Sequence, residues 1–239
     1  MKKIMGIINC TPDSYFDGGS YDPIVQGQKL IQEGADLLDI GGESTRPGFT
    51  PVSIEEELRR VIPVVKALNG YTLSIDTSKP EVAIQAFENG ASILNDVTGF
   101  ENPQMREIAR GKKVILMHCR KEENLIPGML SFFEKRAKEL DGSEIILDPG
   151  IGFGKTVDQN YLILKNLKSF TELGFPLLMG LSRKSFIQKV LNRTAAEILP
   201  ATLALNTLSL IEGVDYIRVH DVREHRQILT VLERLQSVS

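Results

Sequence analysis

The chain has 239 residues, of which 28 are lysine or arginine and 31 are aspartate or glutamate, so its formal net charge is −3. Hydrophobic residues make up 42% and charged residues 25%, which is ordinary for a globular protein and excludes collagen-like, coiled-coil and disordered classes. The slightly acidic balance argues against nucleic-acid binding, because nucleic-acid-binding proteins carry a clustered basic excess. A local basic pocket for a small anion remains compatible with it.

The two cysteines, Cys10 and Cys119, are too few for a disulfide framework, and the chain has no Cys-x-x-Cys pair for zinc. The apolar run at residues 4–8 is too short for the core of a signal peptide or for a membrane span. These features predict a cytoplasmic protein with reduced thiols and no membrane attachment.

Eight short apolar runs alternate along the chain with longer segments of helical period. An apolar run without polar alternation is typical of a strand that is buried on both faces. The predicted strands span residues 4–9, 37–41, 73–76, 93–96, 114–118, 145–148, 177–180 and 216–220.

Helix signals fill the segments between these strands. The first predicted helix covers residues 24–33, and Ser53 caps the second, residues 54–68, whose first turn holds three glutamates. A third covers residues 81–88 and ends at Asn-Gly. The other helices are predicted to begin at Asn102-Pro, near Ser131, near Asp158, near Ala195 and at Asp221 or Val222.

Strand followed by helix, repeated eight times, is the pattern of a (β/α)8 TIM barrel, an α/β fold of roughly 250 residues. A doubly wound open sheet is the alternative, but the number of repeats and the chain length favour the barrel. Because no Ser/Gly-rich linker or composition shift divides the chain, we predict a single domain over residues 1–239.

The carboxyl ends of the strands open onto the active face of such a barrel, and every predicted strand ends in polar residues. A buried carboxylate there can instead cap the following loop, a role we expect most for Asp39 and Asp96. A lone histidine such as His118 is also more often structural. Polar residues at all eight ends nevertheless indicate a deep pocket. These residues are Asn9, Asp39, Asp76, Asn95, Asp96, His118, Asp148, Ser182, Arg183, Lys184, Arg218, His220 and Asp221.

Two subsites follow from the chemistry of these side chains. The loops after the last two strands commonly bind phosphate in this fold, and basic residues there suit a multiply charged anion such as pyrophosphate. Asp76 and Asp148, with Asn95 between them, suit a ring rich in N–H donors, such as a guanidine-like heterocycle edge. We expect these acidic groups at one end of the pocket and, at the other end, Lys184, Arg218 and His220.

Other interpretations of these motifs fit less well. The carboxylates could hold a divalent metal, but zinc barrels favour histidine-rich ligand sets and this chain has three histidines. Mg²⁺ carried mostly by substrate phosphates is compatible with the sequence. The glycine-rich segment 148–155 lacks Walker and Rossmann spacing, so we interpret it as a flexible loop whose Phe153 lies against a bound ring or packs on the barrel rim. The segment at Ser182 and Lys184 lacks the frame of a Ser-Lys hydrolase.

Together these motifs resemble the dihydropteroate synthase family. They occur in the family's order, cover nearly the whole chain and stand at residues 9–19, 39–48, 74–77, 95–97, 117–118, 147–154, 180–186 and 217–221. The longest are Asn9-Cys-Thr-Pro-Asp-Ser-Tyr-Phe-Asp-Gly-Gly19, Asp39-Ile-Gly-Gly-Glu-Ser-Thr-Arg-Pro-Gly48 and Gly180-Leu-Ser-Arg-Lys-Ser-Phe186.

The resemblance implies a TIM barrel that joins 6-hydroxymethyl-7,8-dihydropterin pyrophosphate to p-aminobenzoate, giving 7,8-dihydropteroate and pyrophosphate in folate biosynthesis. It also implies Mg²⁺ as cofactor, sensitivity to sulfonamides and a homodimer. The predicted helix over residues 198–211 is apolar on more than one face, which is consistent with a partner covering its outer side.

The roles expected of single residues also come from this resemblance. The residues expected to bind the pterin are Asp76, Asn95, Asp148 and Lys184. Those expected to hold the pyrophosphate are Asn9, which is also placed beside the magnesium, Arg218 and His220. Thr45 and Arg46 belong to a second loop that meets the pyrophosphate, while Pro47, Ser185 and the first loop help to form the p-aminobenzoate pocket. The complete substrate-binding set is Asn9, Thr45, Arg46, Asp76, Asn95, Met117, Asp148, Phe153, Gly180, Lys184, Ser185, Arg218, Val219 and His220, and the catalytic set is Lys184, Arg218, His220, Asp76 and Asp148.

A dissociative substitution follows from the chemistry of these substrates. The arylamine is neutral at pH 7 and needs no strong base, so the difficult step is breaking the carbon–oxygen bond to pyrophosphate. Arg218, His220 and Mg²⁺ are expected to stabilise charge on the leaving group. Asp76 and Asp148 are expected to stabilise the pterin as it becomes cationic.

The chain departs from the family's common pattern at three places. Tyr15 and Phe16 stand in the first loop where Phe-Ser is usual, Cys10 replaces Val, and the short segment after His118 lacks Met-x-Gly-x-Pro. Two alternatives stay open. One is a methyltetrahydrofolate methyltransferase-like barrel, which would not need the basic segments at 182–185 and 218–220. The other is a non-catalytic pterin-binding paralogue, against which the intact set of pocket residues argues.

Overall fold

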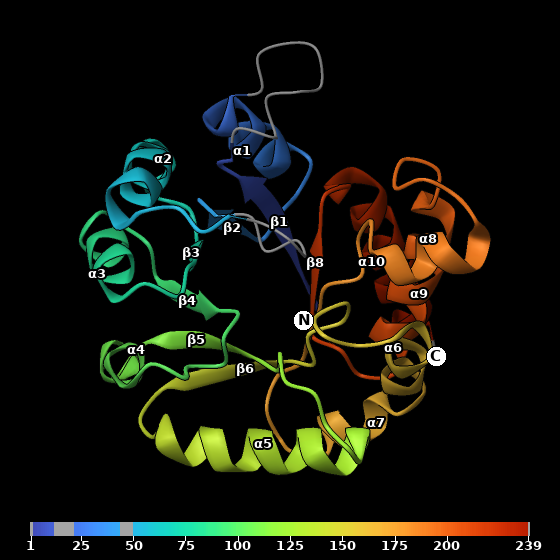
Figure 1. Ribbon diagram of the computed structural model, residues 1–239. Coiled ribbons are helices and arrows are strands. Elements are labelled where there is room, and N and C mark those ends of the chain that lie inside the picture. The colour runs from blue at the N-terminus through green and yellow to red at the C-terminus, as the bar shows by residue number, and fades with distance from the viewer. Residues whose placement is uncertain (1, 12–21, 44–49, 239) are drawn as a thin grey trace.

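The computed structural model describes residues 2–11, 22–43 and 50–238. Eight parallel strands form one sheet in the order β6-β5-β4-β3-β2-β1-β8-β7, and Figure 1 shows them around a common axis with helices on the outside. The sheet closes where Leu147 pairs with Leu177 and the Leu147 N–H donates to the Pro176 carbonyl at 2.9 Å. The predicted (β/α)8 barrel is therefore confirmed.

The eight strands lie where the apolar runs predict them, and each bound is within one residue of the prediction. A strand enclosed by helices outside and by side chains inside must be apolar on both faces, which is why the signal is so clear. The strands are β1 (Lys3–Asn9), β2 (Leu37–Gly41), β3 (Leu73–Asp76), β4 (Ile93–Asp96), β5 (Lys113–Met117), β6 (Glu144–Asp148), β7 (Leu178–Met179) and β8 (Tyr216–Val219).

The helices differ from the prediction mainly in the second half of the chain. The fifth begins at Leu125, because Pro127 lies in its first turn, where a missing N–H costs nothing. Short helices α7 and α8 were not predicted. No helix in the described part of the chain is long and apolar enough to cross a membrane. The helices are α1 (Pro23–Gln32), α2 (Ile54–Ala67), α3 (Pro80–Glu88), α4 (Pro103–Ala109), α5 (Leu125–Glu139), α6 (Val157–Lys165), α7 (Leu167–Thr171), α8 (Ser185–Leu191), α9 (Leu199–Ile211) and α10 (Val222–Ser237).

Caps explain several of these helix starts. Ser53 Oγ accepts a hydrogen bond from the Glu56 N–H at 3.2 Å, as predicted for α2. Thr156 caps α6 with a reciprocal contact to Gln159, the pattern of a capping box. Before α9, Glu197 accepts hydrogen bonds from Thr194. That turn occupies the residues at which the sequence predicted the helix start, so α9 begins later.

Each strand lies between two apolar layers, one outside the barrel and one inside it. The larger one lies between the sheet and the helices, while a smaller cluster fills the lower part of the barrel interior. The inner cluster consists of Met5, Leu37, Ile93, Ile115, Ile146, Leu178 and Tyr216. Side chains two positions further along a strand lie on the same face and nearer its carboxyl end. This alternation places a polar layer directly above the inner cluster, formed by Asp39, Asn95, Asp148 and Arg218.

Candidate active site

The polar layer is built around the guanidinium group of Arg218. Its Nε donates to Asp39 Oδ2 at 2.6 Å and its Nη2 donates to Asp76 Oδ2 at 3.2 Å. Asn95 Nδ2 donates to the same Asp39 oxygen at 3.0 Å. Asp39 is fully buried, so its carboxylate fixes side chains from β4 and β8 at the carboxyl end of the barrel.

Sequence reasoning missed this role of Asp39. Asp39 has a structural role, as expected, but the hydrogen bonds that it accepts within the described residues come from other strands and not from its own loop. Asp96 does have the predicted role, since its Oδ1 accepts from the N–H and the hydroxyl of Thr98 at 2.8 and 2.7 Å. Strand alternation distinguishes the two: Asp39 shares a face with Leu37 of the inner cluster, and Asp96 lies on the opposite face.

Two carboxyl groups of this site, Asp76 and Asp148, have raised pKa values. Burial and the neighbouring Asp39 raise the pKa of Asp76 to about 8, although Arg218 opposes the shift. Burial also raises the pKa of Asp148, against a 2.7 Å hydrogen bond that its Oδ1 accepts from the Gly150 N–H. A ligand that offers N–H donors or positive charge would therefore favour the ionised form of each carboxylate.

Acidic and basic groups alternate in this layer, so the predicted separation of the two kinds at opposite ends of the pocket is wrong. Arg218 forms ion pairs with Asp39 and Asp76, and burial together with Arg218 lowers the pKa of Lys184 to about 8. The Lys184 ammonium group lies 4.3 Å from the ring centroid of Phe153. The site is thus a nearly balanced set of charges, some buried and some partly exposed to the pocket.

His220, directly after β8, is held by Ser182 from the loop after β7. The hydroxyl of Ser182 lies 3.0 Å from His220 Nδ1 and accepts the His220 backbone N–H at 3.3 Å. Burial, Arg183 and Arg218 lower the pKa of His220 to about 3. The imidazole is therefore neutral near pH 7, and it can meet an anion as a hydrogen-bond donor rather than as a cation.

Several hydrogen bonds hold the glycine-rich loop after β6 in this structure, and its expected flexibility stays a prediction. The Gly152 N–H donates to Asn160 Oδ1 at 2.7 Å, and the Lys155 ammonium donates to three backbone carbonyls. Phe153 of this loop contacts Lys184, which places its ring beside the polar layer.

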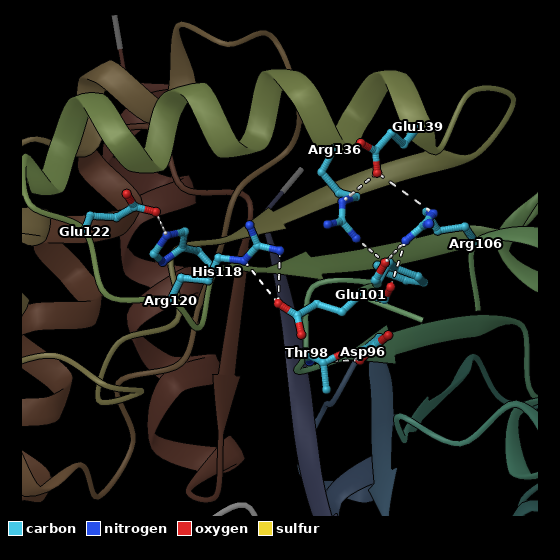
Figure 2. A network of polar contacts seen from close by, with 10 residues as sticks. Asp96, Thr98, Glu101, Arg106, His118, Arg120, Glu122, Arg136 and Glu139 are labelled. Atoms are coloured by element: carbon cyan, nitrogen blue, oxygen red, sulfur yellow. Dashed lines mark hydrogen bonds and ion pairs between the residues drawn. The ribbon is translucent and has the colours of Figure 1, made fainter. Parts of the chain in front are cut away.

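A second polar network joins the loops after β4 and β5 to one another and to α4 and α5, as Figure 2 shows. The carbonyl of Phe100 accepts from Arg106 Nη1 at 2.7 Å and from Arg136. His118 Nε2 lies 3.1 Å from Glu122 Oε1, and its ring packs edge-on against Phe132. The His118 side chain thus packs toward α5, which is the structural role expected of a lone histidine.

The other described residues of the predicted set lie at the same end of the barrel. Asn9 ends β1, Met117 ends β5 and Val219 ends β8, while Gly180 follows β7 and Ser185 begins α8. The predictions for Thr45, Arg46 and Pro47 in the second loop, and for Tyr15 and Phe16 in the first, fall outside the described residues. Their positions relative to the pocket stay predictions.

A family model described as pterin binding enzyme matches residues 5–220. The chain belongs to the pterin binding enzyme family. Within this family it is 41% identical to the dihydropteroate synthase of Bacillus subtilis, over 97% of this chain and 88% of that protein. It is 39% identical to the dihydropteroate synthase of Escherichia coli, over 96% of this chain and 90% of that protein. The resemblance to dihydropteroate synthases is therefore confirmed.

Solved structures of pterin binding enzymes show the same fold. The dihydropteroate synthase of Xanthomonas albilineans with 4-aminobenzoic acid has a TM-score of 0.94 and 38% identity, covering 100% of this chain and 94% of that one. The Yersinia pestis enzyme in complex with a sulfonamide drug has a TM-score of 0.93 and 35% identity, covering 99% and 95%.

Proposed function

We propose that this protein is a dihydropteroate synthase, a transferase that joins 6-hydroxymethyl-7,8-dihydropterin pyrophosphate to p-aminobenzoate. The observation that carries the proposal is the polar layer of Asp39, Asn95, Asp148 and Arg218 together with Asp76, which accepts from Arg218. These residues stand within the family's motifs at the carboxyl end of the barrel. The products are 7,8-dihydropteroate and pyrophosphate.

The pterin ring binds in the polar layer. Its amino and imino N–H groups donate to Asp76 and Asp148. Because burial disfavours the ionised form of both carboxyl groups, these hydrogen bonds stabilise the carboxylates. Asn95 offers both an amide donor and an acceptor, and Asp39 holds its orientation. Lys184 lies near enough to both carboxylates to influence their charge and binds acceptor atoms of the ring.

Catalysis consists of stabilising charge separation as the bond between the pterin methylene carbon and the bridging pyrophosphate oxygen breaks. The electron pair leaves with pyrophosphate, and the methylene pterin that remains is cationic. Ionised Asp76 and Asp148 stabilise that cation. The amine nitrogen of p-aminobenzoate then attacks the methylene carbon and loses a proton to solvent.

The pyrophosphate leaving group contacts hydrogen-bond donors rather than unpaired cations. Neutral His220 presents a ring N–H, and Arg218 keeps N–H donors beyond the two that its carboxylate partners accept. These donors are fixed before the substrate arrives, by Ser182 in one case and by Asp39 in the other. Preorganised donors of this kind stabilise developing negative charge without reorganisation.

Mg²⁺ fits this site as an ion carried mainly by the substrate. Within the described residues, no group of three His, Cys, Asp or Glu side chains could hold a metal. Asn9 supplies one amide oxygen at the end of β1, and Mg²⁺ commonly combines a few protein oxygens with substrate phosphates and water. When bound, the ion would neutralise charge on the pyrophosphate.

We also propose a homodimer that forms through the outer faces of α9 and α10, which pack side by side. Leu208 and Ile211 on α9 are each 59% exposed, and Val231 and Leu235 on α10 are each 67% exposed. Exposed apolar side chains on two neighbouring helices are consistent with an interface. A cytoplasmic location is part of the proposal, and the two unpaired cysteines support it.

Turnover of the pterin pyrophosphate with and without p-aminobenzoate tests the proposed activity. We expect dihydropteroate and pyrophosphate in equal amounts, and inhibition by a sulfonamide that competes with p-aminobenzoate. A protein that binds the pterin but forms no dihydropteroate would instead be the non-catalytic paralogue. Oxygen-18 in the bridging position tests the dissociative route: scrambling without amine supports an early cation, and its absence together with no pyrophosphate release contradicts it.

A further inference from the structure

The ammonium group of Lys155 occupies an unusual position in the loop after β6. Its Nζ donates to the carbonyl oxygen of His118 at 3.0 Å, to that of Gly150 at 3.0 Å and to that of Phe153 at 3.1 Å. An ammonium group has three N–H donors, so these three carbonyls use all of them. The side chain is half-buried and its charge is compensated by peptide dipoles.

Lys155 takes part in no ion pair in the described part of the chain. No carboxylate oxygen there therefore lies within 4.0 Å of its ammonium group. A half-buried lysine without a close carboxylate partner is destabilising unless its donors are satisfied. Burial accordingly lowers the pKa of Lys155 to about 8. Because these three carbonyls are the partners that satisfy its donors, the ammonium group of Lys155 links their positions to one another.

The three carbonyls belong to two loops that meet at the pocket. His118 follows Met117 at the end of β5, while Gly150 and Phe153 follow β6. The two loops are in close contact, since a Cβ added at Gly150 would overlap the His118 carbonyl oxygen. Lys155 bridges this contact and also ties Phe153 to it, beside the ammonium group of Lys184.

We propose that Lys155 is a positioning residue for the pterin substrate, whose ammonium group joins the loops after β5 and β6 and thereby fixes Phe153 and Met117 beside the ring. This inference rests on the proposed function, because the ring is the pterin of that reaction. Lys155 touches neither substrate in this arrangement. Its effect is therefore expected in substrate affinity rather than in the bond-breaking step.

The first test replaces Lys155 with methionine, which keeps the length of the side chain and removes its donors. For Lys155→Met we expect the KM of the pterin pyrophosphate to rise about tenfold, with kcat and the KM of p-aminobenzoate within about twofold of wild type. The matched control is Lys168→Met on α7, an exposed lysine, which should leave all three constants unchanged.

Chemical rescue separates a role of the ammonium group from a general loss of packing. In a Cys119→Ser background, Lys155→Cys is alkylated with 2-bromoethylamine, which restores an ammonium group at the same number of bonds from Cβ. Iodoacetamide gives a neutral side chain for comparison. Cys10 should not react, because burial raises the pKa of its thiol to about 12 and only the thiolate is nucleophilic.

Recovery of the pterin KM by the aminoethylated protein, and not by the amide, supports the proposal. An unchanged pterin KM in Lys155→Met overturns it, and so does a fall in kcat alone, which would report only less folded enzyme. Equal recovery with both reagents would also overturn it, because the charge and its three donors would then be dispensable. If wild-type protein itself forms no dihydropteroate, the proposed function fails instead.

Discussion

Among single residues, Asp39 has the widest influence on the candidate site. It is fully buried and holds both Arg218 and Asn95, while its charge contributes to the raised pKa of Asp76. The carboxylate of Asp39 need not touch the substrate. It nevertheless positions two expected substrate-binding side chains, Arg218 and Asn95, and affects the protonation of a third, Asp76. This is the kind of support that preorganised sites require.

Asp39→Asn tests that influence. The variant keeps the shape of the side chain but removes its charge, so Arg218 loses a charge-assisted hydrogen bond. We expect kcat/KM for the pterin pyrophosphate to fall about tenfold or more. We also expect the acidic limb of its pH profile to move to lower pH, because one cause of the raised Asp76 pKa is gone. An unchanged limb would show that Asp39 does not control Asp76.

The wild-type pH profile follows from two groups with pKa values of about 8. Asp76 must be ionised to stabilise the cation, so activity falls as the pH drops below about 8. Lys184 must be protonated, so activity also falls above about 8. We expect a bell-shaped profile of kcat/KM with its maximum near pH 8. A flat profile from about pH 6 to about pH 9 would contradict both assignments.

Lys184→Ala tests the assignment of the cation beside Phe153. Removal of Lys184 leaves Asp148 and Asp76 without one of the positive charges that favour their ionisation, so kcat/KM should fall at least about a hundredfold. The matched control is Lys189→Ala on α8, where the lysine is exposed and activity should be retained. Near-normal turnover by Lys184→Ala would remove Lys184 from the catalytic set.

Among the structural elements, the loop after β6 combines several constraints on its backbone. Gly150 adopts a φ of +66° and lies against the His118 carbonyl, so it combines a left-handed backbone with a close approach. Gly142 adopts a φ of +83° but has nothing within 4 Å of an added Cβ. Substitutions at the two glycines therefore distinguish the effect of backbone strain alone from that of strain combined with steric overlap.

Gly150→Ala should be destabilising by clearly more than Gly142→Ala. We expect a loss of about 1 kcal/mol in the free energy of unfolding for Gly142→Ala, from the left-handed backbone alone. Gly150→Ala should lose at least about 2 kcal/mol, since the two loops must also move apart. Denaturant unfolding measures both changes, and equal losses would argue against the close contact of the loops.

For the whole molecule, the open question concerns the outer surface formed by α9 and α10. Leu208→Arg places a charge within the proposed interface, so the variant should sediment as a monomer with an unchanged circular dichroism spectrum. Val25→Arg on α1 is the matched control, because Val25 is equally exposed at 59% but lies on a different helix. A dimer that withstands Leu208→Arg would place the interface elsewhere.

The sequence by itself determined the barrel and the residue types at its open end. Strands buried on both faces must be apolar, and some of the helices between them begin at their own caps, such as Ser53 and Asn102, so eight repeats can be recognised without tertiary information. The carboxyl ends of the strands are also recognisable from the sequence. They line the pocket above the apolar side chains that fill the barrel, so polar residues follow each apolar run. Ser53 and Asp96 show that local hydrogen bonds are equally readable.

Only the tertiary structure decided how the polar side chains pair. Asp39 and Arg218 are 179 positions apart in the chain, and no local pattern states that β2 and β8 direct them to one point inside the barrel. The same holds for Lys155 and the His118 carbonyl, 37 positions apart, whose hydrogen bond joins the glycine-rich loop to the loop after β5. Closure of the sheet brings such residues together, and burial then makes pairing obligatory, because an unpaired charge inside the barrel would cost more than the fold can offset.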